Sequence, residues 1–309
     1  MQIAEKDIPG PKRNYVGHGR NVPKVVWPNE ARVAINIVVN YEEGSEVHMG
    51  ADGQNEAGLA ELNYVMTPGY RDLAMESVYE YGTRAGIWRL QRLFDETKIP
   101  VTFFAAAVAL ERNPAVGKWI GEADHETCSH GWRWEEVWLL SREDEKAHIA
   151  AAVKSIAETT GQRPQGWYCR YGPSVHTREL VAEEGGFVYD ADAYNDDLPY
   201  YVDVKGKQHL VVPYTFTYND GRYVIPQGFG SPSDFFDTVK RGFDYYWEEG
   251  ATHPRMMSIG LHPRLIGQAA RMSALKEFIE YAQKKGRVWF AKRIDIANWW
   301  NDHHQEFES

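Results

Sequence analysis

The chain has 309 residues, 43% of them hydrophobic, so it can bury a full core and is neither a disulfide-stapled mini-protein nor a disordered tail. Its net charge of −10 gives no positive field for a phosphate backbone or an anionic lipid surface, so we expect neither nucleic acid nor a membrane as a partner. The two cysteines, Cys128 and Cys169, form no C-x-x-C motif and indicate free thiols in a reducing compartment.

The N-terminal region is predicted to be an extended arm. Residues 1–30 are rich in proline, glycine and basic side chains, and we expect them to run along the body of the protein or a neighbouring subunit. Residues 1–10 lack the apolar segment of a signal peptide, and no run approaches the length of a membrane-spanning helix, so the sequence predicts a cytoplasmic protein. The Gly17-x-Gly19 pair follows no strand and is interpreted as a turn.

From residue 31 onward, short apolar strands alternate with amphipathic helices. The strands are predicted at 31–40, 101–106, 125–129, 166–169, 187–191, 210–213, 256–261 and 288–291. Helices are predicted around 87–94, after Ser141, at 177–184, after Ser231 and at 271–285, and the two serines are typical helix N-caps. Residues 45–72 are glycine-rich and predict a loop over a site or an interface.

This alternation predicts an α/β fold with a parallel sheet. The number of strands, seven or eight, and the chain length favour a closed or nearly closed barrel over an open doubly wound sheet. We expect one catalytic domain over residues 31–300. A C-terminal tail at 301–309, with His303 and His304 exposed to solvent, is expected to follow it.

Acidic, imidazole and aromatic side chains stand where predicted strands end. In chain order they are Glu42, Glu43, His130, Trp167, Tyr168, Asp190, Asp192 and His262. The carboxyl ends of parallel strands share one rim, and α/β barrels place their active sites there. The positions therefore predict that residues far apart in the chain converge on one site.

Several of these residues also have a structural interpretation. Glu42 and Glu43 point to opposite sides if the chain is extended, so only one faces a pocket, or the pair is a solvated turn. A buried carboxylate there would act as a general base, because burial raises its pKa toward neutrality. His262 is interpreted as a general acid or as a core residue bonded to a carbonyl, and His130 as functional or structural.

Other chemistries fit the sequence less well. His125 and His130 do not have the spacing of helix-borne zinc ligands. A Cys128–His130 nucleophile pair is conceivable, although neighbours along a strand point apart. The acidic cluster at 190–197 lacks the pattern of a calcium loop, and Asp190 or Asp192 is interpreted as an orienting carboxylate.

Three of these segments resemble ordered motifs of the polysaccharide deacetylase superfamily, carbohydrate esterase family four. They are residues 40–44 (NYEEG), 125–131 (HETCSHG) and 258–262 (SIGLH). The resemblance covers roughly residues 30–300 and implies a distorted (β/α) barrel of about seven parallel strands.

The chain also departs from that pattern. Typical deacetylases carry two aspartates where this chain has Glu42 and Glu43, and a second histidine where it has Trp134; the Arg-x-Pro motif becomes 166–173 (GWYCRYGP). A site that loses one of three ligands should bind zinc poorly, so we expect no metal cofactor. Zinc is the alternative, and Glu43 and His130 would then hold it.

These departures are similar to the bacterial allantoinases of the superfamily, and cyclic-imide hydrolases are relatives with a similar pattern. Segments 79–86 (YEYGTRAG), 196–200 (DDLPY) and 262–272 (HPRLIGQAARM) carry this similarity. It implies a metal-independent homotetramer that acts in purine breakdown. Pro263 is a departure within this branch, where a small or thiol residue is expected, and it could mark altered specificity.

The sequence therefore predicts hydrolysis of a ring C–N amide bond in a small cyclic ureide, with allantoin as the expected substrate. Glu42 activates water, His262 protonates the departing nitrogen, and a backbone N–H near Trp167 and Tyr168 stabilises the oxyanion. Glu43 and His130 occupy the former metal positions and order the water. The residues expected to contact substrate are Trp134, Trp167, Tyr168, Asp192 and Arg264.

Two other functions stay open. One is a metal-dependent N-deacetylase of amino sugars, although the absence of a signal peptide counts against an extracellular glycan. The other is a non-catalytic binding protein, although the carboxylate pair and His262 argue against it. The sequence does not decide which cyclic amide is cleaved.

Overall fold

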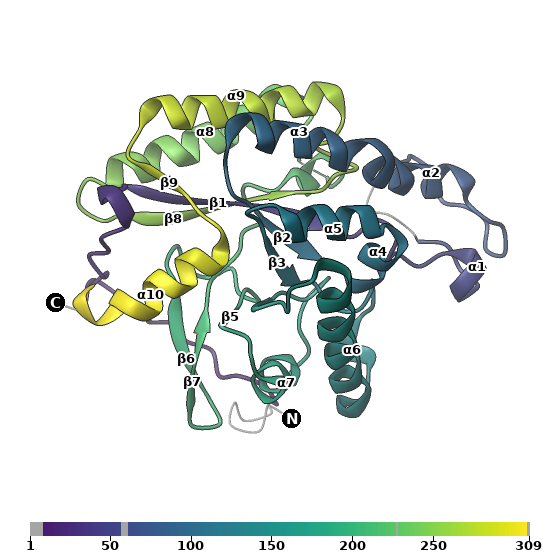
Figure 1. The fold of residues 1–309 in the computed structure, drawn as a ribbon, viewed down its shortest axis with the longest axis horizontal. Helices are drawn as coiled ribbons and strands as arrows, with labels where there is room; N and C mark the ends of the chain where they lie inside the picture. The colour runs from purple at the N-terminus through teal and green to yellow at the C-terminus, as the bar shows by residue number, and fades with distance from the viewer. Residues whose placement is uncertain (1–8, 57–60, 227, 308–309) are drawn as a thin grey trace.

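A computed structural model describes residues 9–56, 61–226 and 228–307. Its architecture is one curved sheet with helices packed on its outer face (Figure 1). The strands are β1 Val33–Tyr41, β2 Thr102–Ala105, β3 Glu126–Ser129, β4 Gly166–Trp167, β5 Tyr189–Asp190, β6 Tyr200–Val204, β7 Lys207–Val211, β8 Arg255–Leu261 and β9 Val288–Phe290.

The helices alternate with these strands. They are α1 Met49–Asp52, α2 Leu73–Tyr81, α3 Ile87–Thr97, α4 Ala107–Arg112, α5 Pro114–Glu122, α6 Arg142–Thr160, α7 Thr177–Glu184, α8 Pro232–Glu249, α9 Ala269–Lys285 and α10 Arg293–Phe307. A π-helical turn at Gly82–Gly86 joins α2 to α3. Short 3₁₀ turns lie at Pro28–Glu30, Val137–Leu139 and Asp220–Tyr223.

The sheet is a half-barrel. Its strand order is β6-β7-β5-β4-β3-β2-β1-β8, with β9 paired beside the start of β1. Every neighbouring pair is parallel except the β6–β7 hairpin. In the part of the chain that the structure describes, no ladder joins β6 to β8, so the barrel stays open there. The expected barrel-like parallel sheet is confirmed, whereas strand β6 was not predicted.

Alternation along β1 separates the two faces of the sheet. Val33, Ile35, Ile37, Val39 and Tyr41 pack on the outer side, in the cluster that contains apolar residues of α3, α8 and α9. The residues between them face inward, and α10 adds apolar side chains to this inner cluster. Both faces are covered, as a parallel sheet requires. The predicted serine caps are also present, at Ser141 for α6 and Ser231 for α8.

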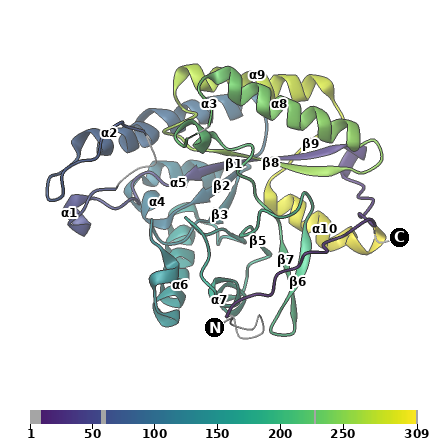
Figure 2. The same ribbon diagram turned by 180° about the vertical axis from the view of Figure 1, so that it is seen from behind.

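The N-terminal segment passes along the C-terminal helix. Residues 9–27 run without regular structure along the β6–β7 hairpin and α10 before β1 begins (Figure 2). The indole N–H of Trp299 donates to the Val26 carbonyl at 2.9 Å, and Trp27 is buried. Residues 301–307, expected in a tail, are the last turns of α10, and Phe307 is buried. Among the described residues, no helix is long and apolar enough to cross a membrane.

Candidate active site

The strand ends bring the predicted rim residues into register. Tyr41 pairs with Ala105, Ala105 with Ser129, and Ser129 with Trp167. The residue after each strand therefore emerges at the same edge of the sheet. Because β8 lies on the other side of β1, its end adds His262 to this rim.

Glu42 is the centre of the site. Its Oε1 lies 3.0 Å from His130 Nε2 and 3.1 Å from Arg170 Nε. Its Oε2 lies 3.4 Å from Arg264 Nη1 and 3.9 Å from His262 Nε2. The carboxylate is buried, so these partners rather than bulk water surround its charge. An acid from the beginning of the chain and an imidazole from near its end thus face each other.

The two adjacent glutamates have opposite pKa shifts. Burial opposes ionisation of Glu42, but the charge of Arg170 and the hydrogen bond from His130 hold its pKa well below the usual range. The expected rise of this pKa toward neutrality is therefore reversed by the neighbouring charges, although burial itself acts in the expected direction. Burial raises the pKa of Glu43 to about 7, although the nearby charge of Arg264 opposes the rise.

Glu43 lies in a turn after β1, where the Ser45 N–H donates to the Glu42 carbonyl, and its carboxyl group contacts Arg264. Its Oε1 accepts the backbone N–H of Arg264 at 2.9 Å. Its carboxyl group also packs against Gly82 in the π-helical turn. The carboxylate that contacts His130 is Glu42.

His262 is held by Asp220, which sequence reasoning missed. Asp220 Oδ1 lies 2.6 Å from His262 Nδ1, and its Oδ2 accepts the backbone N–H groups of His262 and Ile266 at 2.8 and 3.0 Å. A carboxylate only accepts, so Nδ1 carries the proton and Nε2 is directed toward Glu42. The His262 side chain is 13% exposed, so it is not sealed in the core.

His130 contacts acceptors at both ring nitrogens. Nδ1 donates to the Tyr168 carbonyl at 2.8 Å, and Nε2 faces Glu42. Both ring nitrogens of His130 are therefore engaged by protein oxygens. The Tyr168 ring stacks on the imidazole, with centroids 5.1 Å apart and an interplanar angle of 10°. Tyr168 therefore lies at the site, as predicted.

Arg170 is the cation nearest to solvent. Its guanidinium carbon lies 3.7 Å from the Trp134 ring centroid and 4.0 Å from that of Tyr171. The Arg170 side chain is 13% exposed, whereas that of Arg264 is 1% exposed. A substrate can therefore reach Arg170, while Arg264 lies behind Glu42 and Trp134 contributes by holding Arg170. The sequence quoted Arg170 within a motif but gave it no role.

Other predicted site residues lie away from Glu42. Trp167 is buried in a small apolar cluster with Ile149, Leu180 and Val181, and it also lines a small cavity with His130 and Arg170, so its expected role as a substrate wall stays a prediction. The Tyr168 N–H donates to the Ser129 carbonyl, so this predicted oxyanion donor is already engaged.

Asp192 acts on the loop that carries Arg170. Its Oδ1 accepts the N–H of Cys169 at 2.9 Å. Burial, followed by the charge of Asp190, raises its pKa to about 7. Asp190 is bound in turn by Arg178 and His209. Asp192 is therefore an orienting residue rather than part of the Glu42 cluster.

The donor set does not fit a zinc ion. In the ranges 9–56, 61–226 and 228–307, no three His, Cys, Asp or Glu side chains are grouped as metal ligands. His130 Nε2 is engaged by Glu42, and the third family position is the indole of Trp134, which offers no lone pair. Arg170 and Arg264 bring permanent positive charge to the same carboxylate. The side chains at this site therefore have to supply the chemistry themselves.

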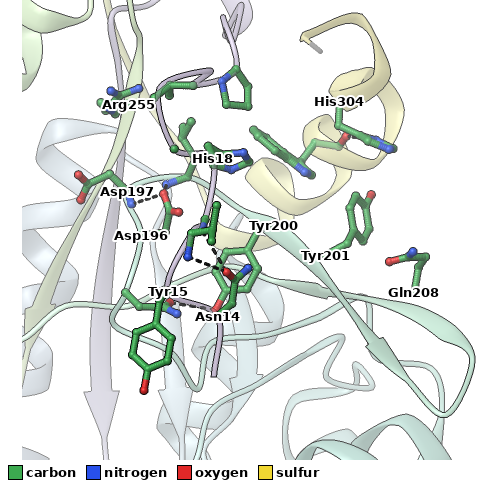
Figure 3. A pocket seen from close by; sticks show the side chains of 18 of the residues that line it. Asn14, Tyr15, His18, Asp196, Asp197, Tyr200, Tyr201, Gln208, Arg255 and His304 are labelled. Carbon is green, nitrogen blue, oxygen red and sulfur yellow. Dashed lines mark hydrogen bonds between the residues drawn. The ribbon is translucent and has the colours of Figure 1, made fainter. Parts of the chain in front are cut away.

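A separate cavity lies beside the N-terminal arm. It has a volume of about 1030 Å³, and its lining includes Tyr15, Asp196, Tyr200 and His304 (Figure 3). None of Glu42, His130 and His262 lines it. It is therefore distinct from the charged cluster at the strand ends.

Comparisons with known proteins agree with this geometry. The family model described as polysaccharide deacetylase matches residues 74–189. A Schizosaccharomyces pombe protein assigned to the polysaccharide deacetylases is 37% identical over 315 positions, covering 94% of this chain and 98% of the relative. The chain belongs to the polysaccharide deacetylase family. It is accordingly a hydrolase of carbohydrate esterase family four.

Two crystal structures of family members are similar over nearly the whole chain. One is a probable polysaccharide deacetylase from Pseudomonas aeruginosa PAO1, with 48% identity and a TM-score of 0.90. The other is PuuE allantoinase, with 47% identity and a TM-score of 0.90. Each match covers 94% of this chain and 98% of the other. These two members are about equally similar to this chain but have different names. The comparisons therefore do not identify the substrate, and the site must.

Proposed function

We propose that this family member hydrolyses a ring C–N amide bond in a small cyclic ureide, and that allantoin is its substrate. The observation that carries the proposal is the 3.9 Å separation of Glu42 Oε2 and His262 Nε2, with Asp220 behind the imidazole. Amide hydrolysis needs a base for water and an acid for nitrogen. The 47% identity to PuuE allantoinase supports the choice of substrate.

Glu42 and His262 divide the proton transfers. Glu42 accepts a proton from the attacking water, and the water oxygen bonds to the amide carbon. His262 donates its Nε2 proton to the ring nitrogen as the C–N bond breaks, so that nitrogen leaves as the neutral N–H of a ureido group. The low pKa of Glu42 favours return of its proton to His262, which restores the starting state.

The oxyanion is stabilised by groups on the loop after β4. The backbone N–H groups of Arg170 and Tyr171 form no hydrogen bond within the described residues. The Arg170 guanidinium belongs to the same loop and contacts Glu42. Tyr171 has a φ of 69°, an uncommon value for a non-glycine residue that often accompanies functional sites. Preorganised donors of this kind contribute about 3 kcal/mol each to catalysis.

The reaction proceeds without a bound metal in this proposal. The guanidinium groups of Arg170 and Arg264 and the imidazole of His130 surround Glu42, where a zinc centre would need further unprotonated ligands. A metal-dependent N-deacetylase of amino sugars is the second candidate, favoured by the family membership and by the name of the P. aeruginosa relative.

A turnover screen tests the proposal. Purified protein is assayed on allantoin, hydantoin, succinimide, dihydrouracil and N-acetylglucosamine oligomers, before and after exhaustive chelation and with zinc added back. We expect ring opening of allantoin that survives chelation. Deacetylation that requires zinc would favour the second candidate, and turnover of none of these compounds would indicate a non-catalytic member.

Substitution of the two reacting groups is the first prediction. Glu42→Gln and His262→Ala should each lower kcat on allantoin by about 10²–10⁴-fold, because each removes one proton transfer. Tyr245→Phe is the control, since Tyr245 is 70% exposed on α8, and it should keep kcat within about threefold. Retention of kcat in Glu42→Gln would refute the assigned base.

The proposal extends to assembly and location. As the resemblance to the allantoinase branch implies, the chain forms a homotetramer that acts in the cytoplasm in purine breakdown. Light scattering of the purified protein tests the assembly, and a monomeric mass at working concentration would contradict it.

A further inference from the structure

The helix that runs past the active site contains an unusual turn. Helix α2 continues through the π-helical turn at Gly82–Gly86 into α3 without leaving helical geometry. The N–H of Ile87 donates to the Gly82 carbonyl, five residues back, as a π-helix requires. Single π turns inside α-helices are rare overall. Those that occur are often found at functional sites. This one has a glycine at each end.

The two glycines touch the chain neighbours of the reacting residues. A Cβ on Gly82 would lie 2.6 Å from Glu43 Oε1, and Glu43 follows Glu42. A Cβ on Gly86 would lie 2.0 Å from the Pro263 carbonyl oxygen, and Pro263 follows His262. Both distances are far shorter than van der Waals contact, so no larger residue fits without a shift.

The contact at Gly86 is built from backbone on both sides. A Cβ on Gly267 would lie 2.1 Å from the same Pro263 oxygen and 2.5 Å from Gly86 Cα. From the flanking helices, Tyr81 Oη donates to the Gly267 carbonyl at 3.2 Å, and Arg89 donates to that carbonyl as well. The loop after His262 is therefore clamped against the π turn and has little freedom to move away.

We propose that this turn is a spacer that sets the distance between the base and the acid. It contacts the neighbour of Glu42 at one glycine and the neighbour of His262 at the other, and so fixes the two residues relative to one rigid element. Gly82, Gly86 and Gly267 touch no reacting atom in this account and are positioning residues. Pro263, the departure noted in the sequence, supplies the carbonyl against which the turn packs.

A displacement of about 1 Å at this spacing costs roughly 100-fold in rate, because proton transfers need near-ideal geometry. Gly86→Ala should therefore lower kcat about 100-fold and change KM less than about threefold. Thr83→Ala is the matched control: it lies in the same turn, its side chain is directed away from the site toward the Glu80 carbonyl, and it should retain kcat. Equal losses in the two variants would overturn the proposal.

A second comparison covers the case in which Gly86→Ala does not fold. Gly82→Ala meets only the end of the Glu43 side chain, and Glu43→Asp shortens that side chain. If Gly82 acts by leaving room for Glu43, the kcat loss from Gly82→Ala should be smaller in the Glu43→Asp background. Losses that simply multiply would show that Gly82 and Glu43 are not coupled, and would overturn the proposal.

The kinetic readout rests on the proposed function. A structural readout therefore tests the spacer separately from the proposed reaction. Crystal structures of Gly86→Ala, or of Gly82→Ala in its place, should show Glu42 Oε2 and His262 Nε2 separated by at least about 1 Å more than the present 3.9 Å. An unchanged separation would overturn the spacer even if allantoin is cleaved. A wider separation in a protein inactive on every ring amide would keep the spacer and reject the proposed reaction.

Discussion

Two glutamates that are neighbours in sequence are in different electrostatic environments. Glu42 faces Arg170, His130 and His262, so its ionised form is stabilised despite burial. Glu43 has only Arg264 as a nearby cation, which partly offsets burial, and its pKa is raised to about 7. Environments that push the pKa values of paired carboxyl groups apart are a common way to give them separate roles. Here the cations and imidazoles around each carboxyl group produce that difference.

Asp220 is expected to control the direction and charge of His262. Asp220→Asn keeps an oxygen for the backbone N–H groups of His262 and Ile266, but it replaces the charged acceptor at Nδ1. We expect kcat to fall by about 10²-fold or more with a changed pH–rate profile, since imidazolium is less stabilised. Asp203→Asn, a change of the same kind at an exposed turn, should leave both unaltered. A profile identical to wild type would contradict the assigned role.

Asp192 is expected to make stability depend on pH. Its pKa in the folded protein is about 7, above the ordinary value of 3.8, so the folded state keeps a proton that the unfolded state has lost between these values. The free energy of unfolding should therefore fall as pH rises from about 4 to about 7.

Asp192→Asn should flatten that dependence. The amide oxygen can still accept the Cys169 N–H, so the geometry is kept while the titration is removed. We expect the variant to gain on the order of 3 kcal/mol relative to wild type between pH 4 and pH 8, measured by urea unfolding at each pH. Glu43 contributes a slope of the same sign, which remains. Parallel curves for variant and wild type would contradict the assignment.

At the scale of elements, the sequence predicted the features that depend on neighbouring residues in the chain, such as helix caps. The serine caps of α6 and α8 were found because a hydroxyl three residues before an aspartate satisfies free N–H groups at a helix start. Strand β6 was missed because its residues are half-buried and its pairing with β7 comes from tertiary context. The π turn has no sequence signature comparable to a serine cap. Its glycines can be read from the sequence, but they do not by themselves indicate a π turn.

The cap of α6 gives a stability prediction that is independent of function. Ser141 Oγ accepts the Asp144 N–H at 3.1 Å, so Ser141→Ala should lower the free energy of unfolding by about 1 kcal/mol. Ser273→Ala, inside α9 and exposed, is the matched control and should be neutral or slightly stabilising. Both should keep wild-type kcat. Similar effects at the two serines would show that Ser141 does not act as a cap.

At the scale of the whole molecule, site residues at the ends of strands were easier to identify from the sequence than site residues outside the strands. Glu42, His130 and His262 were identified because a parallel sheet gathers its carboxyl ends. Asp220 and the role of Arg170 were missed because Asp220 begins a short 3₁₀ turn and Arg170 lies in a loop, and neither has a periodicity that indicates direction. Trp167 packs in an apolar cluster because one residue along a strand reverses the face, and its neighbour Tyr168 took the site-facing position.

The open side of the half-barrel is held by a buried arginine at the start of α10. Arg293 Nη1 donates to Asn36 Oδ1 of β1 at 2.7 Å and to Ser258 Oγ of β8 at 3.0 Å. Its Nη2 donates to the Val212 and Pro213 carbonyls after β7, the first of these through a short contact. One side chain thus joins β1 and β8 to the chain after β7, where no strand ladder does.

Arg293→Met should therefore destabilise the whole fold. The methionine fills similar space, but it leaves buried acceptors on three segments unpaired, and we expect a loss of about 3–5 kcal/mol. Arg287→Met removes a half-exposed arginine and should cost less than about 1 kcal/mol. Guanidinium unfolding measures both changes through their midpoints. If the Arg293 variant lost no more than the Arg287 variant, the sheet curvature alone would have to hold β8 in place, and His262 would owe its position to β1 pairing rather than to this bridge.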